Sequence, residues 1–363
     1  MFEELTAYLD SFSEMGIPYY DCLIRIHGEE VYRRRNGFLD PEKTVRPTGK
    51  EFTNFYSCSK QVTCTAALQL WEKGLFSLED RVSDYIPEYA ELTVETEDGI
   101  RKCDTPLLIK HLFEMSSGYG YASMPHLHDT ALKEYGGKPT TLDAVRLLAR
   151  EPLEFTPGLK WRYGSSHDIL AALVELISGE RFGQYVKEHI FDVCGMTRST
   201  FYPCEVNHAE IAQQYIFDKE SQKVLPIGPE LSSLFNLGPY YESGGAGLRS
   251  TVEEYSSFLE HLRSGEELLK RSTIALQTTN RYTDREYSSG HGRYGYGLGC
   301  RCPLPGNPLR AFGWGGKAGQ FFAVDLEHDL TIVYSQHVVS PPNSSLRGKI
   351  YDVVLKELEK AGS

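Results

Sequence analysis

The segment FYSCSKQVTCTAALQLWEKGLFSLEDRVSDYIPEY, residues 55–89, contains the most informative pattern of this chain. It opens with the only S-x-x-K tetrapeptide among the 363 residues. The spacing of its apolar residues predicts a helix over residues 54–73 that ends at Gly74. Residues three and four apart share a helix face, so one stripe holds Ser57, Lys60, Cys64, Ala67 and Trp71.

A lysine on a stripe of apolar or small residues is unusual, because Lys is rarely buried without a partner. Desolvation lowers a lysine pKa, by up to ~3–5 units when burial is full. The pattern therefore indicates a neutral Lys60 amine one helical turn from the Ser57 hydroxyl, which it could deprotonate. Ser57 would lie at the helix start, where free N–H groups stabilise developing negative charge. In the alternative, structural interpretation, Lys60 extends to solvent and Ser57 caps the helix.

Outward from this segment, strand patterns occupy both ends of the chain and helical patterns lie between them. Helices are predicted over residues 2–15, 105–115, 141–150, 168–177, 182–193, 251–263 and 346–358. Strands are predicted over residues 19–26, 31–38, 294–300, 310–314, 320–325 and 330–336. The simplest architecture is α+β. One antiparallel sheet domain comprises residues 1–75 and 240–363, and a mainly helical domain, residues 76–239, is inserted into it.

Composition narrows the function classes. The net charge of −12 argues against nucleic acid or an anionic membrane as a partner, since both require clustered Lys and Arg. No run approaches ~18 consecutive apolar residues, so no membrane-spanning helix is expected. The first residues, MFEELTAYLD, lack the basic start and apolar run of a secretory signal. With eight scattered cysteines, interpreted as reduced thiols, these features predict a cytoplasmic protein.

Beyond residue 89, a series of short motifs follows the S-x-x-K segment in a fixed order. They are LFEMSSG at 112–118, FTPG at 155–158, YGS at 163–165, ISG at 177–179, CGMT at 194–197, GGAGLRST at 244–251 and GWGGKAG at 313–319. Together with residues 55–89, this series resembles the serine β-lactamase and penicillin-binding protein superfamily, especially its class C and esterase branch. The resemblance covers roughly residues 15 to 340.

The resemblance implies a β-lactamase/transpeptidase-like fold, in which a five-stranded antiparallel sheet flanked by helices lies beside an all-helical domain. The active site would occupy the cleft between them. Ser57 would be the nucleophile that forms an acyl-enzyme, and Lys60 and Tyr163 would move the protons. A phenol has a reference pKa of about 10, and a nearby ammonium would stabilise its phenolate. By the same analogy, the backbone N–H groups of Ser57 and Lys317 would form the oxyanion hole.

Two positions depart from the family pattern. Ser165 stands where the family's Asn follows the tyrosine, and its side chain is shorter. Trp314 stands where a β-lactamase has the strand lysine that faces the substrate carboxylate, and an indole carries no charge. Ser165, Trp314, Gly315 and Gly316 are expected to contact substrate, with the glycines allowing close backbone approach.

These departures favour an esterase or amidase acting on a small-molecule ester, amide or β-lactam. The alternatives are a β-lactamase or D-Ala peptidase, and a non-catalytic binding protein that kept the cleft. No metal or other cofactor is expected. His126-Leu127-His128-Asp129 lacks zinc-hydrolase spacing and is predicted to be a polar loop, and no G-x-S-x-G elbow exists. Cys300 and Cys302 are expected on one face of a strand, in the core.

Overall fold

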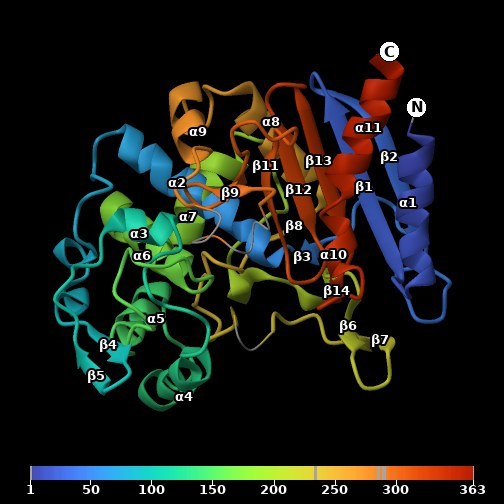
Figure 1. The fold of residues 1–363 in the computed structure, drawn as a ribbon. Helices are drawn as coiled ribbons and strands as arrows, with labels where there is room; N and C mark the ends of the chain where they lie inside the picture. Colours follow the sequence, from blue (N-terminus) through green and yellow to red (C-terminus); the bar gives the residue numbers. More distant parts are fainter. Residues whose placement is uncertain (1, 233–234, 284–286, 288–291, 363) are drawn as a thin grey trace.

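A seven-stranded antiparallel sheet forms the frame of the computed structural model, which describes residues 2–232, 235–283, 287 and 292–362 (Figure 1). Its strand order is β2-β1-β13-β12-β11-β10-β9. The strands are β1 (Tyr19–Ile26), β2 (Glu29–Gly37), β9 (Gly295–Tyr296), β10 (Arg301–Cys302), β11 (Phe312–Gly315), β12 (Phe321–Asp325) and β13 (Leu330–Ser335). The first and last parts of the chain thus pair in one sheet, as the sequence predicts.

Strands with mainly apolar side chains lie inside the sheet, and a strand with charged side chains lies at its edge. The interior strand β13 is buried along its whole length, as are the first six residues of β1, and both are rich in apolar residues. The edge strand β2 is partly exposed and carries Arg33, Arg34 and Arg35. Charged side chains on an edge strand disfavour pairing with another sheet. The predicted hairpin of β1 and β2 is confirmed, with Tyr19 opposite Gly37.

The prediction of five strands is wrong, because two short strands extend the sheet beyond β11. The run at residues 294–300 was expected to form one strand. Instead, Gly299 has a φ of +86°, a left-handed conformation that reverses the chain, and Gly297 N–H donates to the Cys300 carbonyl. The run therefore splits into β9, a turn and β10. Cys300 lies in the turn rather than in a strand, although its side chain and that of Cys302 are both buried.

Helices cover both faces of the sheet. On one face lie α1 (Glu3–Glu14), α10 (Ser344–Arg347) and α11 (Ile350–Gly362), and the two chain ends emerge beside each other (Figure 1). Leu5, Leu9 and Phe12 of α1 are fully buried in an apolar core with side chains of β1 and β13. On the other face α8 (Val252–Ser264) contacts β13, β1 and β12. Thr251 caps this helix by accepting a hydrogen bond from Glu254 N–H.

The middle of the chain forms the mainly helical part, on the left in Figure 1. Its helices are α3 (Ile109–Phe113), α4 (Met124–Tyr135), α5 (Thr141–Leu148), α6 (Ser166–Ser178) and α7 (Phe182–Val186). Its strands are β4 (Thr93–Thr96) and β5 (Gly99–Lys102). The hairpin of β6 (Gln214–Asp218) and β7 (Lys223–Ile227) lies apart from this part, at the lower right of Figure 1, where β6 pairs with residues Val338–Val339. The remaining elements are α9 (Arg271–Gln277), β3 (Thr53–Asn54), β8 (Arg249–Ser250) and β14 (Val338–Val339).

Helix α4 corrects one prediction. His126 and His128 were expected in a polar loop, but both lie on α4. Pro125 in the first turn and Gly136, with a φ of +60° after the last turn, are ordinary helix boundary signals. His126 Nδ1 shares a hydrogen bond with the Glu151 carboxyl group, so a structural role accounts for its position.

Helix α2 (Ser59–Glu72) connects the two parts of the molecule, and α6 and α7 pack against it. Every residue from Ser59 to Leu68 is buried. The predicted division into an apolar stripe and a polar face is therefore wrong. Gln61 is buried and donates to the Gln277 side chain, and Thr65 donates to the Gln61 carbonyl. The domain boundaries at residues 75/76 and 239/240 stay a proposal.

The eight cysteines are free thiols, and all except Cys204 are buried. Among the described residues, the structure has no helix with the length and apolar character needed to cross a bilayer.

Candidate active site

Ser57 lies in a single 3₁₀ turn, Tyr56–Cys58, that leads directly into α2. The preceding residue, Tyr56, has a φ of +44°, which costs a side-chain-bearing residue of order 1–3 kcal/mol and occurs mostly at functional sites. Surrounding contacts hold this conformation. The Tyr56 hydroxyl donates to Gln214 at 2.9 Å, and its ring packs edge-on against Phe235. Ser57 itself is 6% exposed and faces a cavity.

Lys60 is completely buried, and its amine has three polar neighbours. Nζ lies 3.4 Å from Ser57 Oγ and 3.3 Å from the Tyr121 hydroxyl, and it donates to the Gly245 carbonyl at 2.6 Å. It also lies 4.7 Å from the centre of the Tyr163 ring, within cation–π range. These contacts fix the amine one helical turn from the serine.

The charge of Lys60 differs from the sequence-based expectation. Burial by itself lowers the pKa of Lys60, but Tyr121, Tyr163 and Asp168 around it raise the pKa above the ordinary lysine value overall. The direction of this shift favours the ammonium form of Lys60 over the neutral amine that its apolar stripe indicates. An ammonium can stabilise negative charge on a neighbouring oxygen, but it cannot itself remove the serine proton.

Asp168 on α6 organises the loop that faces the Lys60 ammonium. Its Oδ1 accepts hydrogen bonds from the Tyr241 hydroxyl at 2.8 Å, the Ser243 hydroxyl at 2.7 Å and Gly245 N–H at 3.2 Å. Asp168 is 4% exposed. The carboxylate thus holds Gly245, whose carbonyl binds Lys60, and supplies a negative charge near the ammonium.

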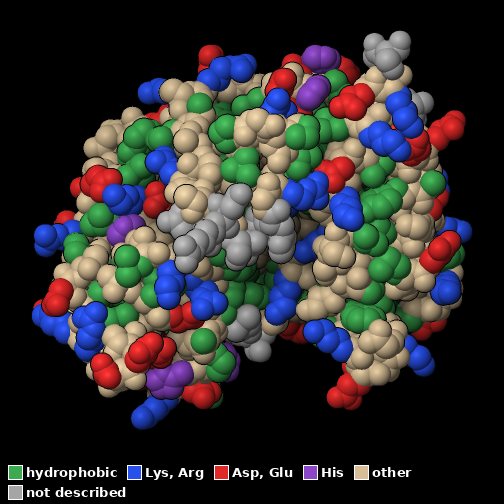
Figure 2. Space-filling model, viewed as in Figure 1, with side chains coloured by type: hydrophobic (Ala, Val, Ile, Leu, Met, Phe, Trp, Pro, Cys, Tyr) green, Lys and Arg blue, Asp and Glu red, His purple; other side chains and the backbone are tan. Residues whose placement is uncertain are grey.

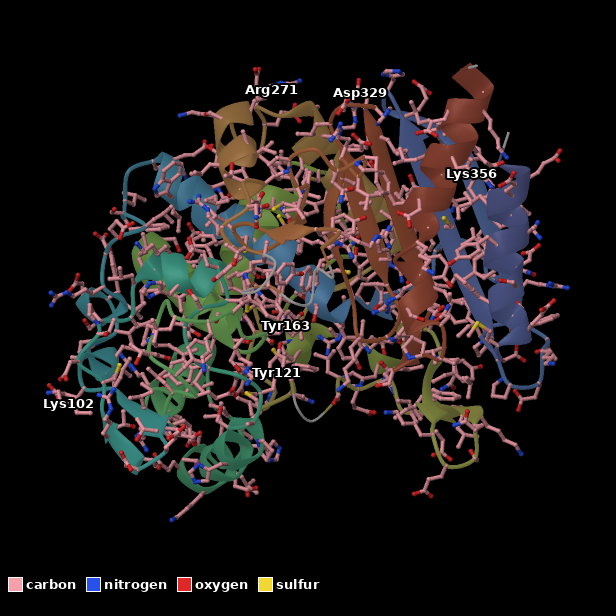
Figure 3. The ribbon with its side chains drawn as sticks, viewed as in Figure 1. Lys102, Tyr121, Tyr163, Arg271, Asp329 and Lys356 are labelled. Atoms are coloured by element: carbon pink, nitrogen blue, oxygen red, sulfur yellow. The ribbon has the colours of Figure 1, made fainter. Side chains whose placement is uncertain are left out.

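Tyr163 and Tyr121 come from two loops of the helical part and lie next to each other at the junction with the sheet (Figure 3). Gly120 and Gly164 form an antiparallel bridge that brings the two loops together. The rings of the tyrosines pack edge-on at 5.8 Å. Trp314 of β11 donates from Nε1 to the Tyr163 hydroxyl at 3.0 Å. Both phenols therefore face the centre that contains Ser57 and Lys60.

The end of β11 approaches the Ser57 turn closely. A Cβ added at Gly316 would lie 2.6 Å from the Phe55 carbonyl oxygen and 2.3 Å from Gln320 Oε1, so only glycine fits there. The next residue, Lys317, donates no backbone N–H hydrogen bond among the described residues. Its Nζ lies 5.2 Å from the centre of the Phe235 ring, and burial lowers its pKa.

These groups open into one cavity of about 600 Å³. It is lined by Ser57, Tyr121, Trp161, Tyr163, Phe235, Tyr287, Arg301, Trp314, Gly315, Gly316, Lys317, Phe321, Ser344, Arg347 and Gly348. Figure 2 shows a hollow below the middle of this face, with hydrophobic side chains deep inside it and basic side chains on its margin. The walls are mainly aromatic, which suits an organic ligand.

The structure brings most of the predicted site residues together. Ser57, Tyr163, Trp314, Gly315, Gly316 and Lys317 line the cavity, and Lys60 lies directly behind Ser57. Ser165, which precedes α6, stays apart from them, because it is 1% exposed and its hydroxyl donates to Sδ of Met124 on α4. The residues that sequence reasoning missed are Tyr121, Asp168, Gly245, Arg301 and Arg347. Two of these residues had a signal in the sequence: Tyr121 follows the LFEMSSG motif, and Gly245 lies within the GGAGLRST motif.

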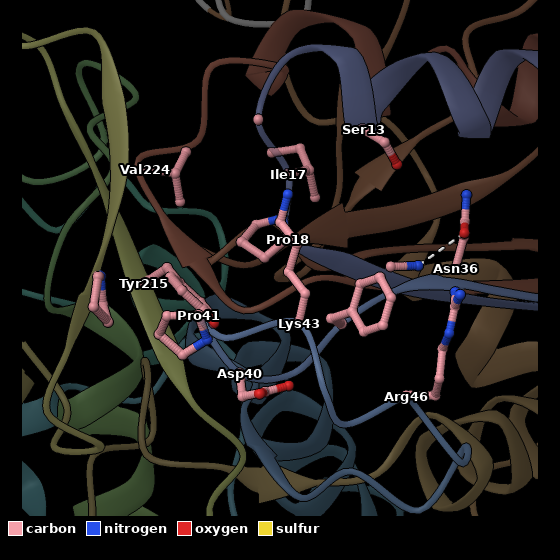
Figure 4. Close-up of a pocket in the computed structure, with 14 residues that line it drawn as sticks. Ser13, Ile17, Pro18, Asn36, Asp40, Pro41, Lys43, Arg46, Tyr215 and Val224 are labelled. Carbon is pink, nitrogen blue, oxygen red and sulfur yellow. Dashed lines mark hydrogen bonds between the residues drawn. The ribbon is translucent and has the colours of Figure 1, made fainter.

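Two other features lie away from this cavity. A second pocket of about 480 Å³ lies between the start of β1, the loop after β2 and the β6–β7 hairpin (Figure 4). Its one carboxylate, Asp40, accepts hydrogen bonds from Thr44 and Val45 of its own loop. Among the residues that the structure describes, one group of potential metal ligands lies within 4.8 Å: Glu180, Glu188 and His189. None of the three lines the Ser57 cavity.

Known proteins resemble this chain over most of its length. A curated relative, the putative penicillin-binding protein PbpX of Bacillus subtilis, is 29% identical over 244 residues, 66% of this chain and 55% of PbpX. This chain therefore spans little more than half the length of that relative. Lovastatin esterase of Penicillium rubens is 25% identical over 368 residues, which cover 90% of each protein.

A solved structure resembles the fold as a whole. EstCE1, described as a hydrolase with promiscuous acyltransferase activity, superimposes with a TM-score of 0.79 over 97% of each chain at 23% identity. The fold is therefore the β-lactamase/transpeptidase-like α+β fold. The family model described as Beta-lactamase matches residues 15–354, nearly the whole chain. The chain belongs to the Beta-lactamase family.

Proposed function

We propose that the chain is a serine hydrolase that forms an acyl-enzyme on Ser57 from a small-molecule ester or amide. The observation that carries the proposal is the buried Lys60 ammonium, 3.4 Å from Ser57 Oγ and in contact with two tyrosines that line the same cavity. A nucleophile needs a nearby group to accept its proton, and a phenolate beside an ammonium can be that group.

Because Lys60 is charged, the proton acceptor in this mechanism is Tyr163 in its phenolate form. Ser57 Oγ forms a bond to the substrate carbonyl carbon while its proton moves to Tyr163. The tetrahedral intermediate then expels the leaving group, which takes the proton from Tyr163. Water then attacks the acyl-enzyme and gives a proton to Tyr163. Tyr163 returns a proton to Ser57 Oγ as the acid product leaves. Lys60 stabilises the phenolate, and Trp314 N–H orients its oxygen.

The oxyanion would lie between the backbone N–H groups of Ser57 and Lys317. The close packing of Gly316 against the Phe55 carbonyl fixes the second donor relative to the first. Each such donor is worth about 3–4 kcal/mol of transition-state stabilisation. Catalysis would therefore depend on the contact between β11 and the 3₁₀ turn.

Esters are the favoured substrate class because the cavity is mainly aromatic and Trp314 replaces a charged strand residue. Lovastatin esterase, with 90% coverage of both proteins, supports this choice by its name, as does esterase EstB of Burkholderia gladioli, which is 26% identical. Ser165 makes no substrate contact in this proposal, since it lies outside the cavity.

The test is hydrolysis of p-nitrophenyl butyrate by the wild-type protein and by Ser57→Ala. We expect the variant to lose about a thousandfold or more in kcat/KM. Ser264→Ala, a serine on the surface of α8, is the matched control and should retain full activity. A fluorophosphonate probe should label the wild type and the control on Ser57 and leave Ser57→Ala unlabelled. Equal hydrolysis by wild type and Ser57→Ala would contradict the proposal.

The second candidate function is a β-lactamase or D-Ala peptidase, which the resemblance to PbpX favours. Such an enzyme should be acylated at Ser57 by a fluorescent penicillin. Labelling of Ser57 by the penicillin would support this candidate, and the absence of labelling would exclude it. A third candidate, a non-catalytic binding protein, requires that the fluorophosphonate fail to react with Ser57.

A further inference from the structure

The pocket between the start of β1, the loop after β2 and the β6–β7 hairpin shares no lining residue with the Ser57 cavity (Figure 4). Its volume of about 480 Å³ lies in the usual range for sites that hold small organic molecules. The proposed hydrolysis uses none of the side chains around it. The pocket is therefore a candidate site for a ligand of its own, and its walls indicate the chemistry of that ligand.

Close contacts between distant segments form this pocket in the free protein. Gly37, at the end of β2, has a φ of +90°, and an added Cβ would collide with the Pro18 carbonyl group. Tyr215 of β6 is 3% exposed and donates from its hydroxyl to the Leu39 carbonyl at 2.8 Å. That hydrogen bond joins the β6–β7 hairpin to the loop after β2. The pocket is thus largely pre-formed, as is usual for small-molecule sites.

The walls of the pocket are mainly apolar. They include Ile17, Pro18, Phe38, Pro41, Val224 and Pro226. Three of these residues are prolines, whose rings have almost no rotamer freedom to lose when a ligand covers them. An apolar chain or ring of a ligand would therefore bind against these walls with little cost in side-chain entropy.

Two cations of the loop after β2, Lys43 and Arg46, line the same space. Neither forms an ion pair with a carboxylate of the described residues, whereas Arg34 on the adjoining strand β2 pairs with Asp10. The guanidinium carbon of Arg46 lies 4.1 Å from the centre of the Phe38 ring, and this cation–π contact holds it beside the apolar wall. Positive charge is therefore left for a ligand to pair with.

The one carboxylate that lines the pocket, Asp40, forms no ion pair with these cations. Its two oxygens accept hydrogen bonds from the Thr44 hydroxyl, Thr44 N–H and Val45 N–H. The Thr44 hydroxyl above all, together with the two N–H groups, lowers the pKa of Asp40 to about 2. Glu42, the other acid of this loop, does not line the pocket. Asp40 thus orders the loop and leaves both cations without a direct partner.

Lys43 has a backbone conformation that indicates a use for its side chain. Its φ of +59° lies in the left-handed region, which Gly or Asn adopts with less strain than Lys. Such strain outside glycine points to a functional side chain. In Figure 4 the Lys43 side chain is directed toward Ile17 and Pro18. Its ammonium can therefore pair with an anion that lies against the apolar wall.

We propose that this pocket binds a small amphipathic carboxylate, an anion with an apolar chain or ring. The apolar part lies against Pro18 and Val224. The carboxylate pairs with Lys43 and with Arg46, whose guanidinium presents paired N–H donors. A neutral molecule of the same shape gains only the apolar contacts. The inference goes beyond the proposed hydrolase function and stands without it, because the two cavities share no residue.

A photoreactive ligand tests this pocket separately from the Ser57 cavity. The probe is octanoate with a diazirine at the far end of its chain, and the carbene formed on illumination inserts into neighbouring C–H or N–H bonds. Peptide mass spectrometry of the full-length protein should find crosslinks within residues 13–18 or 224–226. The crosslinking yield at these residues, measured against probe concentration, gives the affinity of this pocket alone.

Competition with unlabelled compounds tests the charge of the ligand. Octanoate should suppress crosslinking in the pocket at a concentration about tenfold or more below that of octanamide, which has the same chain but no charge. The difference should shrink at high salt, because the interaction is electrostatic. Crosslinks found only outside the pocket, or equal suppression by the two compounds, would overturn the inference.

The double variant Lys43→Asn/Arg46→Gln removes both charges and keeps the loop backbone, since Asn tolerates a positive φ. Its crosslinking in the pocket should fall about tenfold or more, while its denaturant midpoint of unfolding stays as in wild type. Arg46→Gln alone should lose about threefold, and Arg46→Lys should keep most of the crosslinking because the charge remains.

The matched control is Lys219→Gln, which removes an exposed charge from the turn between β6 and β7 and should change nothing. Undiminished crosslinking in the folded double variant, or an equal loss in Lys219→Gln, would refute the assignment of Lys43 and Arg46. Each of these measurements is independent of ester hydrolysis. A failure of the hydrolase proposal therefore leaves this test intact.

Discussion

At the residue scale, two tyrosines are candidates for the group that accepts the serine proton. They differ in the hydrogen-bond partners of their hydroxyl groups. The Tyr163 hydroxyl accepts a hydrogen bond from Trp314 Nε1, whereas the Tyr121 hydroxyl has one polar contact among the described residues, the Lys60 amine at 3.3 Å. Burial raises the pKa of Tyr121, which makes its phenolate harder to form. Both tyrosines are half-buried and line the cavity, so the hydrogen bond from Trp314 is the observation that favours Tyr163 as the proton acceptor.

The paired variants Tyr163→Phe and Tyr121→Phe test this assignment, since each removes one hydroxyl and keeps the ring. Tyr163→Phe should lose about 100-fold or more in kcat for p-nitrophenyl esters, the range for loss of a general acid–base group. Tyr121→Phe removes one hydrogen-bonding partner of Lys60 and should lose about 2- to 10-fold. A larger loss in Tyr121→Phe would transfer the catalytic role to Tyr121.

At the scale of elements, the contact between β11 and the 3₁₀ turn sets the distance between the proposed oxyanion donors. Gly316→Ala should push them apart, because the added Cβ would lie 2.6 Å from the Phe55 carbonyl oxygen. We expect a loss of about 1–3 kcal/mol in the free energy of unfolding and a fall in kcat.

Gly348→Ala is the matched control for this element, because Gly348 also lines the cavity but has no atom within 4 Å of an added Cβ. Its free energy of unfolding should change by less than about 0.5 kcal/mol. Denaturant unfolding and ester kinetics of both variants provide the measurement. If Gly316→Ala behaves like Gly348→Ala, the proposed packing constraint is absent.

The whole molecule should lose stability in acid through its buried histidines. His337 is fully buried, accepts from Asn54 N–H through Nε2 and has Nδ1 at 3.1 Å from the Ala212 carbonyl. Burial lowers the pKa of His337 to about 4 from an ordinary 6.5. Neutral His337 therefore contributes fully to the free energy of unfolding above pH 6.5. This contribution is lost as the pH falls toward 4, because the histidine of the unfolded chain binds a proton more tightly than the buried one.

His337→Gln should therefore flatten the pH dependence of the free energy of unfolding between pH 6.5 and 4. The difference from wild type should be about 1.4 kcal/mol per pH unit. Denaturant titrations across this range provide the measurement. The control is His128→Gln, which replaces a half-exposed histidine on α4 and should leave the pH dependence of the free energy of unfolding as in wild type. Parallel curves for wild type and His337→Gln would contradict the prediction.

The sequence by itself determined those features of the protein that depend on the spacing of neighbouring residues or on the order of short motifs. The Ser57–Lys60 relation follows from one helical turn, and the hairpin of β1 and β2 follows from alternating side chains around a glycine turn. The order of the landmark motifs, Tyr163 among them, predicted the fold. These features need no knowledge of distant residues, because neighbours in the chain or a recurring motif already specify them.

Only the tertiary structure decided which distant groups surround Lys60 and what charge it carries. Tyr121 and Gly245 lie 61 and 185 positions from Lys60 in the chain, and both contact its amine. Burial alone would have made that amine neutral, but the polar and negative groups that the fold brings to it keep it charged. Charge state depends on the whole environment, and spacing along the chain does not encode it.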